Sequence, residues 1–393
     1  MLLGCVFSRW RDPSGLQDLA NAPHSVVEGT FDNYVDHVNH MDTRTFKQRY
    51  WYRKDYWENN GPIFLYICAE ARGGFPSENS FFMNLVKRYK GIGVALEHRY
   101  YGNSIPVANF TVENLQYLSH TQALADVAHF ITQFKKGFQD PEKQPIKVFC
   151  VGGSYAGALS AWARYQFPHI FDGALASSAV VSAIQDFYLF DEQVRISVLK
   201  SGKDCQDNIL TLLNMIRQLW NTDPVQAKQK YRANFMEWDD FMFYFADIFV
   251  EVVQYGRRTE LCNFLKTIMK DPSIHEKLRD FAARYGNVPE PYAFRFIRDI
   301  KPNIDANYRQ WTYQYCSSLA YFNTPGREVP LRFKEMNLTY WARYCQKSFE
   351  TAIYPDTFHT NTLYGDVNIV KHASKIIFTN GGEDPWQWAG IRT

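Results

Sequence analysis

The sequence lacks long hydrophobic runs and an excess of charge of either sign. No stretch reaches the roughly 18 uninterrupted apolar residues that a membrane-spanning helix needs. The 43 Lys and Arg residues nearly balance the 41 Asp and Glu residues, which leaves a net charge of +2. A net charge this small produces only a weak electrostatic field, which excludes strong attraction to nucleic acid or to an anionic membrane. With 393 residues, 46% of them hydrophobic, the chain is large enough for more than one packed domain.

Metal-binding patterns are also missing. The seven cysteines form no C-x-x-C pair, and no His/Cys cluster has the spacing of zinc ligands. We therefore predict no metal and no cofactor.

The N-terminal stretch MLLGCVF is apolar, but it stops at Arg9 and is too short for the apolar core and flanks of a signal peptide. Two acceptor patterns for N-glycosylation begin at Asn109 and Asn337. Together with the cysteines of the second half of the chain, they favour the secretory pathway. We expect a secreted or lysosomal protein whose signal peptide is not evident because the recorded N-terminus is incomplete.

The chain contains two kinds of sequence pattern, short apolar runs and helical periodicity. Short apolar runs at residues 62–70, 91–102, 147–154 and 172–181 are typical of buried strands, and a helical pattern covers 114–136. Strands that alternate with helices predict a mostly parallel sheet. Residues 183–349 instead carry helical patterns, at 209–219, 238–256 and 273–286. A strand pattern followed by a loop pattern returns at residues 375–386. We expect an α/β core formed by residues 30–182 and 350–393, interrupted by a helical cap at 183–349.

The stretch VFCVGGSYAGALSAW places Ser154 between a strand and a helix, with small residues on both sides. This arrangement is typical of a nucleophile elbow, in which a serine occupies a tight, strained turn. Gly152 and Ala156 provide the small neighbours that the turn demands. The backbone N–H of Tyr155, at the start of the helix, is then a natural donor to an oxyanion. The alternative is a glycine-rich turn in which Ser154 only caps the helix.

A serine nucleophile needs a base that is held by a carboxylate, and in this fold the acid follows a late strand. Asp384 lies directly after the last apolar run, and its neighbour Glu383 is the rival. A turn aspartate before Pro385 is the structural alternative. No histidine follows Asp384, and we do not expect His98, His359 or His372 to serve as the base.

Several long segments resemble one family of serine peptidases, which includes lysosomal Pro-X carboxypeptidase, dipeptidyl peptidase II and thymus-specific serine protease. The segments are ALEHRYYGNS (95–104), VGGSYAGALSAWARYQFPHIFDGALASSA (151–179), QYCSSLAYFNT (314–324) and FTNGGEDPWQWAG (378–390). The resemblance covers nearly the whole chain. It implies an α/β-hydrolase core with an inserted helical cap, Ser154 as the nucleophile and Asp384 as the acid.

The resemblance also implies a substrate pocket near Trp386, Tyr101 and Gly102. Its cysteine bridges correspond to Cys205–Cys262 and Cys316–Cys345 here. Cys68 and Cys150 fit better as small buried residues of the core strands, and Cys5 is left over.

The chain departs from the family pattern at three places. The family histidine lies some tens of residues past the acid, so the resemblance implies that the catalytic histidine, the last strand and the closing helix are truncated from this chain. Ala69 replaces a frequent glycine after the first core strand. Ser318 replaces a frequent glutamate after the cap cysteine, which puts the family's recognition of the substrate terminus in doubt here.

These observations predict a serine-type exopeptidase that acts on short or proline-containing peptides. Because loss of the triad base costs about a million-fold in turnover, we expect the 393-residue chain itself to be nearly inactive. The alternatives are a catalytically inactive binding or decoy product and an esterase on the same fold. The expected partner is a peptide substrate, with no nucleic acid and no membrane span, and a homodimer remains open.

Overall fold

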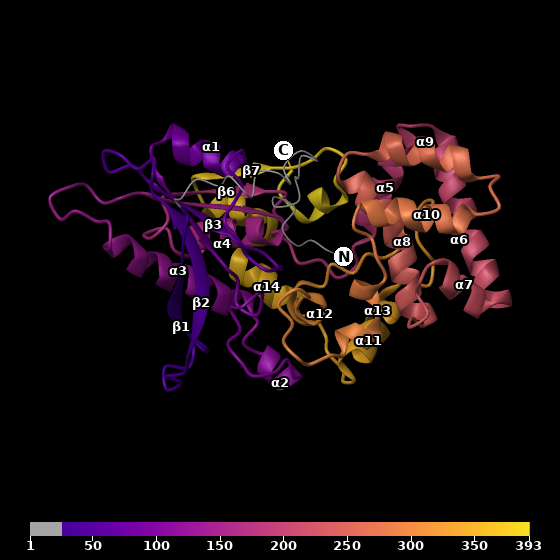
Figure 1. Ribbon diagram of the computed structural model, residues 1–393, viewed down its shortest axis with the longest axis horizontal. Coiled ribbons are helices and arrows are strands. Elements are labelled where there is room, and N and C mark those ends of the chain that lie inside the picture. The colour runs from indigo at the N-terminus through magenta and orange to yellow at the C-terminus, as the bar shows by residue number, and fades with distance from the viewer. Residues whose placement is uncertain (1–25, 393) are drawn as a thin grey trace.

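The computed structural model describes residues 26–392. Figure 1 shows the strands gathered in one half of the molecule and a bundle of helices in the other half. Cys5 and the apolar N-terminal stretch lie outside the described residues. No helix among residues 26–392 has both the length and the apolar character needed to cross a membrane.

A seven-stranded sheet forms the core, in the order β1-β2-β4-β3-β5-β6-β7. All neighbours from β4 to β7 are parallel, whereas β1 and β2 form an antiparallel hairpin and β2 also runs antiparallel to β4. The strands are β1 (Val27–Tyr34), β2 (Thr45–Arg53), β3 (Ile63–Ile67), β4 (Ile92–Leu96), β5 (Val148–Gly153), β6 (Gly173–Ser177) and β7 (Ile376–Thr379). The prediction of a mostly parallel α/β sheet is confirmed. The hairpin was not predicted.

Helices cover both faces of the sheet, which explains why β3 and β4 are buried along their whole length. Alternate side chains of β3 point to opposite faces. Phe64 and Tyr66 pack with Phe82 and Met83 of α1 (Phe81–Arg88). The other side chains of β3 join a larger core that includes α3 (His120–Lys136) and α4 (Tyr155–Gln166).

The helical pattern predicted over 114–136 forms two helices instead of one. α2 (Val112–Leu115) is a single turn capped by Thr111, and α3 begins after Ser119, whose hydroxyl accepts a hydrogen bond from the N–H of Gln122. Ser119 therefore starts a new helix because its side chain satisfies one of the free N–H groups of the first turn.

The segment 183–349 is helical, as its sequence pattern predicts, and extends away from the sheet (Figure 1). Two disulfides cross-link it, Cys205–Cys262 and Cys316–Cys345, with Cα–Cα distances of 5.1 and 5.7 Å. Its longer helices are α5 (Tyr188–Leu199), α6 (Lys203–Thr222), α8 (Trp238–Gln254), α9 (Arg258–Ile268), α10 (Ile274–Arg284) and α13 (Leu338–Phe349). The shorter ones are α7 (Pro224–Lys230), η2 (Glu290–Tyr292), α11 (Phe294–Ile297), α12 (Tyr308–Gln314) and η3 (Tyr315–Leu319).

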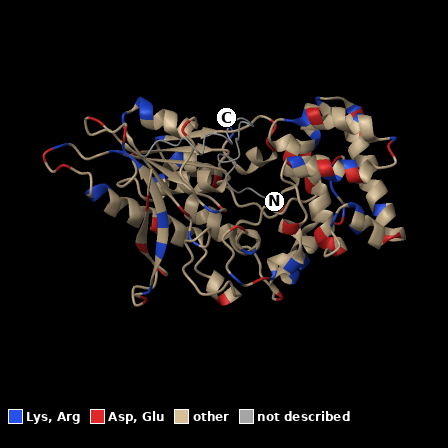
Figure 2. Ribbon diagram, in the orientation of Figure 1, with Lys and Arg blue, Asp and Glu red and all other residues tan. Residues whose placement is uncertain are grey.

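The chain then returns to the sheet and adds β7 at its edge. The elements of this return are α14 (Thr357–Tyr364), η4 (Asp366–Asn368), α15 (Ile369–His372) and η5 (Pro385–Ala389). Acidic and basic residues are interspersed along the chain in both halves (Figure 2). This pattern agrees with the near-neutral net charge.

Candidate active site

Ser154 occupies a strained turn between β5 and α4. Its backbone has φ +59° and ψ −127°, a region that side chains other than glycine rarely adopt. The Ser154 N–H donates to the Ser177 carbonyl at 2.9 Å, which fixes the turn to the end of β6. A Cβ atom at Gly152 would lie 2.1 Å from the Ala156 carbonyl oxygen, and one at Gly157 would lie 2.8 Å from that of Ser177. The turn therefore requires glycine at both positions.

The Ser154 side chain does not cap α4. Its Oγ is buried and has no hydrogen-bond partner, so the role of a helix cap is not filled. The first N–H groups of α4, beginning with that of Tyr155, have no acceptor within the helix. The Tyr155 side chain points into the core, where its hydroxyl lies 3.0 Å from His120 Nδ1 and 3.3 Å from His98 Nε2. These contacts hold the peptide that presents the N–H beside Ser154.

Asp384 follows β7, so it lies past the carboxyl end of its strand, as Ser154 lies past the carboxyl end of β5. Its side chain accepts a hydrogen bond from the Trp386 N–H at 3.0 Å, and only 7% of the residue is exposed. Burial raises the pKa of Asp384 to about 6, while the contacts with Trp386 and Ser178 act in the opposite direction. The rival Glu383 is engaged elsewhere, because Arg258 Nε contacts its two carboxylate oxygens at 2.7 and 2.9 Å. The two neighbouring acids therefore have different environments.

The sheet sets the separation between Ser154 and Asp384. Ser154 follows β5, Asp384 follows β7, and β6 lies between them. Neighbouring strands are about 4.8 Å apart, so the two strand ends are separated by about 10 Å. A serine and a carboxylate at that separation need a bridging group, and an imidazole has the appropriate size.

No histidine among residues 26–392 has a hydrogen bond to Ser154 or Asp384. Burial lowers the pKa of His98 to about 4 and that of His120 to about 3, so both are neutral. Both ring nitrogens of each have partners, which include the Arg99 carbonyl for His98 and the Ser318 hydroxyl for His120. His359 and His372 are exposed, and His372 precedes β7 at the end opposite to Asp384.

The residues predicted to line a substrate pocket are held in packed surroundings. Trp386 packs edge-to-face against Phe190 and Tyr321 of the cap, with ring centroids 4.9 and 5.4 Å away. The hydroxyl of Tyr101 donates to the Gln314 side chain. Gly102 has φ +55°, and a Cβ there would lie 2.0 Å from a carboxylate oxygen of Glu97, so this glycine is needed for the loop itself. A role for these residues in substrate binding stays a prediction.

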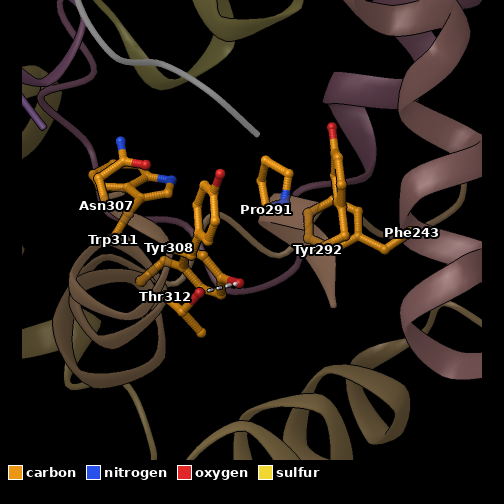
Figure 3. A pocket seen from close by; sticks show the side chains of 8 residues that line it. Phe243, Pro291, Tyr292, Asn307, Tyr308, Trp311 and Thr312 are labelled. Carbon is orange, nitrogen blue, oxygen red and sulfur yellow. Dashed lines mark hydrogen bonds between the residues drawn. The ribbon is translucent and has the colours of Figure 1, made fainter. Parts of the chain in front are cut away.

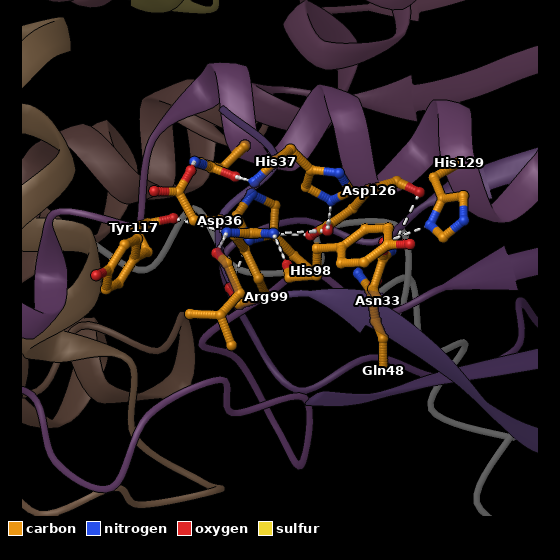
Figure 4. Close-up of polar contacts among 12 residues, drawn as sticks. Asn33, Asp36, His37, Gln48, His98, Arg99, Tyr117, Asp126 and His129 are labelled. Carbon is orange, nitrogen blue, oxygen red and sulfur yellow. Dashed lines mark hydrogen bonds and ion pairs between the residues drawn. The ribbon is translucent and has the colours of Figure 1, made fainter. Parts of the chain in front are cut away.

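A buried ion pair that the sequence analysis missed anchors the loop after β4 (Figure 4). Arg99 contacts Asp126 of α3 through two hydrogen bonds of 2.6 Å and also donates to the backbone carbonyls of Tyr34, Val35 and Tyr117. Asp126 in turn accepts from His37. Because every donor of this buried guanidinium has a partner, the group fixes the hairpin and α3 to the loop that carries Tyr101 and Gly102.

Glu70 is the second feature that the sequence analysis missed. It lies in the loop directly after β3, is fully buried, and receives no hydrogen bond from another residue at either carboxylate oxygen. Burial raises its pKa to about 8. An acidic residue immediately after an apolar strand is the only signal of it in the sequence.

The buried carboxyl predicts a pH-dependent loss of stability. Glu70 is protonated in the folded protein up to about pH 8 but ionises near 4.5 when unfolded. Its stabilising contribution is therefore complete below about pH 4.5 and is lost as the pH rises to about 8. We expect Glu70→Gln to raise the free energy of unfolding by an amount that grows with pH, on the order of 4 kcal/mol between about pH 5 and pH 8.

Urea unfolding at several pH values measures this effect. The exposed Glu142 provides the matched control, and Glu142→Gln is expected to follow the wild-type pH profile. Parallel profiles for Glu70→Gln and wild type would contradict the assignment of Glu70 as a neutral buried acid.

The two glycosylation patterns differ in accessibility. Asn337 is exposed and caps α13 through its side-chain oxygen, which accepts from the Tyr340 N–H at 3.0 Å. Asn109 is half-buried, and its side-chain oxygen accepts from Asn114 at 2.8 Å. In both cases the hydrogen bond uses the oxygen and leaves the nitrogen that would carry a glycan.

Comparison with known proteins extends over most of the chain. The serine carboxypeptidase S28 family matches residues 33–393. An Arabidopsis thaliana protein named "Probable serine protease EDA2" is 34% identical over 376 residues, which cover 91% of this chain and 75% of that protein. Human lysosomal Pro-X carboxypeptidase is 27% identical over 391 residues, which cover 92% and 78%. Among solved structures, Pyrococcus horikoshii acylaminoacyl peptidase has a TM-score of 0.31 at 14% identity, covering 45% of this chain and 26% of that one.

Proposed function

The chain belongs to the serine carboxypeptidase S28 family and is a serine peptidase by that membership, and we propose that it is an exopeptidase in which Ser154 is the nucleophile. The observation that carries this proposal is the unpartnered Ser154 hydroxyl on a strained turn. A serine is held in this conformation at the cost of about 1–3 kcal/mol, and strain of this kind clusters at active sites.

The proposed reaction follows from the positions of the groups. Ser154 Oγ loses its proton to a base and forms a bond to the scissile carbonyl carbon, and the carbonyl oxygen gains the negative charge. The Tyr155 N–H donates to that oxygen. The base then gives the proton to the leaving amine as the C–N bond breaks, and water releases the acyl group from Ser154 by the reverse sequence.

Asp384 acts through the base in this scheme. Its carboxylate orients an imidazole and stabilises the imidazolium that forms. No histidine among residues 26–392 is hydrogen-bonded to either group, so we propose that the base comes from outside the described residues.

The cap favours short substrates. Arg258 at the start of α9 and Lys200 after α5 both pair with Glu383, at 2.7 and 3.4 Å, next to the proposed acid. This contact holds the helical segment over the loop that carries Asp384. A chain end enters such a covered site more easily than the middle of a folded protein. The name of the Pro-X carboxypeptidase relative supports proline-containing peptides as substrates.

We also propose a secreted or lysosomal location. Disulfides persist in oxidising compartments, and both cap bridges are formed here. The exposed Asn337 supports glycosylation in the same pathway. One of the matched relatives is named a lysosomal enzyme and another, from Arthroderma benhamiae, a probable extracellular serine carboxypeptidase.

Labelling with a fluorophosphonate tests the proposal on the 393-residue chain, in buffers with and without added imidazole. We expect slow labelling that imidazole accelerates, because no histidine among residues 26–392 is hydrogen-bonded to Ser154 or Asp384 and free imidazole supplies a base. Rapid labelling without imidazole would mean that a histidine of this chain already serves as the base. Comparing the hydrolysis of an X-Pro peptide with that of a p-nitrophenyl ester distinguishes a peptidase from an esterase. The absence of both labelling and hydrolysis under every condition would favour a non-catalytic binding protein.

A further inference from the structure

The sheet register places the backbone of Glu70 near the turn that carries the proposed nucleophile. β3 and β5 are parallel neighbours, and the last pair in their register is Tyr66 with Val151. Continuing this register by three residues brings Ala69 level with Ser154, and Glu70 follows at once. Because adjacent strands are about 4.8 Å apart, the loop that carries Glu70 begins next to the turn that carries Ser154.

The surroundings of the Glu70 carboxyl contain no positive charge. Its own backbone N–H is the one donor that approaches it. The titratable groups that face it are tyrosines from three segments, Tyr101 after β4, Tyr155 of α4 and Tyr321 after η3. Arg72, two residues further along, is exposed and pairs with Asp305. No lysine, arginine or histidine in the described part of the chain forms an ion pair with Glu70.

The cap fixes the backbone of this loop. The side chain of Asn307, which precedes α12, donates to the Glu70 carbonyl. Asn307 also lines a small pocket with Trp311 and Tyr308 of α12 (Figure 3), and the Trp311 ring lies 5.8 Å from that of Tyr155. The loop is therefore held between the sheet and the cap, so the position of the carboxyl is set by both halves of the molecule.

A buried acid without a donor from another residue is free to accept hydrogen bonds from a ligand. A peptide offers two charged ends. A terminal carboxylate would bring a second negative charge to a place that has no cation. A terminal ammonium would bring three donors and the missing positive charge, and it would form a charge-assisted hydrogen bond with Glu70.

We propose that Glu70 binds the free α-amine of the substrate, so that this site trims peptides from the amino end. The inference rests on the proposed function of Ser154. A residue spans at most about 3.6 Å along an extended chain. An amine anchored at Glu70 therefore lies one or two residues from a carbonyl at Ser154, which makes the released fragment one or two residues long.

Ser318 of the cap is neutral, and its hydroxyl lies 2.9 Å from His120 Nε2 and donates to the Gln314 carbonyl at 3.0 Å. This residue therefore adds no charge that would compete with Glu70.

Isothermal titration calorimetry on the full chain tests this inference with two ligands. Alanyl-prolinamide has a free amine and a blocked carboxyl end, whereas N-acetyl-alanyl-proline has the reverse. We expect the amide to bind at least about tenfold more tightly. At about pH 6, its binding is expected to release close to one proton, because the ammonium ionises Glu70. Titrations in buffers with different ionisation enthalpies measure that proton.

Glu70→Gln is expected to abolish the proton release and the preference for the amide, and Glu142→Gln to preserve both. Equal binding of the two ligands, tighter binding of the acetylated acid, binding of neither, or amide binding without proton release overturns the inference. Fluorophosphonate labelling tests the role of Ser154 separately from the role of Glu70. An adduct on Ser154 without amine binding defeats the inference alone, whereas absence of the adduct defeats the proposed function.

Discussion

Replacing Gly152 with alanine is expected to destabilise the protein by more than about 4 kcal/mol. The added Cβ would lie 2.1 Å from the Ala156 carbonyl oxygen and 2.5 Å from its carbon, both backbone atoms of α4. No side-chain rotation can relieve this overlap, so the strand and the helix must separate at the turn that presents Ser154. Urea unfolding and the soluble yield of the variant measure the effect.

Gly74 provides the matched control for this change. A Cβ at Gly74 would meet no atom within 4 Å, and the residue is exposed. Gly74→Ala is expected to change the free energy of unfolding by less than about 0.5 kcal/mol. A soluble Gly152→Ala variant with wild-type stability would show that the turn tolerates a side chain, and the elbow geometry would then be wrong.

Replacing Ser154 with alanine is expected to remove covalent labelling by a fluorophosphonate while leaving stability nearly unchanged. The reactive oxygen is lost, and removal of a catalytic serine costs about a million-fold in related chemistry. Stability is preserved because the Ser154 hydroxyl has no hydrogen bond to lose. Intact-mass spectrometry after incubation with the probe, in the presence of imidazole, measures the labelling, and urea unfolding measures stability.

Ser160 is the control for this substitution. It lies six residues further along the chain, within α4, is also buried, and donates to the Ala156 carbonyl at 2.8 Å. Ser160→Ala is expected to retain labelling and to lose some stability, the opposite of the result for Ser154→Ala. Persistent labelling of the Ser154→Ala variant would place the reactive group elsewhere.

The strand-to-helix turn could be predicted from the sequence because its determinants are local. Gly152, Ser154 and Gly157 lie within six residues, and the close approach of strand and helix allows only small side chains there. The buried strands were predictable for the same reason, since β3 and β4 are apolar on both faces and are bounded by glycine, proline or charge.

The hairpin β1–β2 could not be predicted in the same way. Most of β1 is exposed or half-buried, so the segment VEGTFDNY has no continuous apolar run. Its pairing depends on β4 and on the contacts of Arg99 and Asp126, which are 27 residues apart. Interactions over such distances in the sequence leave no periodic pattern.

Glu70 illustrates the same limit within the site. An acidic residue after a strand is ordinarily a solvated loop residue, and nothing in the neighbouring sequence indicates that the cap will cover it. Glu70 is fully buried, and Asn307, which lies 237 residues later, donates to its backbone carbonyl. The separate environments of Glu383 and Asp384 likewise depend on Arg258, which the sequence places in a different segment.

The most direct test of the account is a crystal structure of the protein after reaction with a fluorophosphonate. The account predicts a phosphorus atom bonded to Ser154 Oγ, with its free oxygen accepting a hydrogen bond from the Tyr155 N–H and with φ of Ser154 still positive. A phosphorus atom on another residue, or one on Ser154 whose oxygen points away from α4, would contradict it.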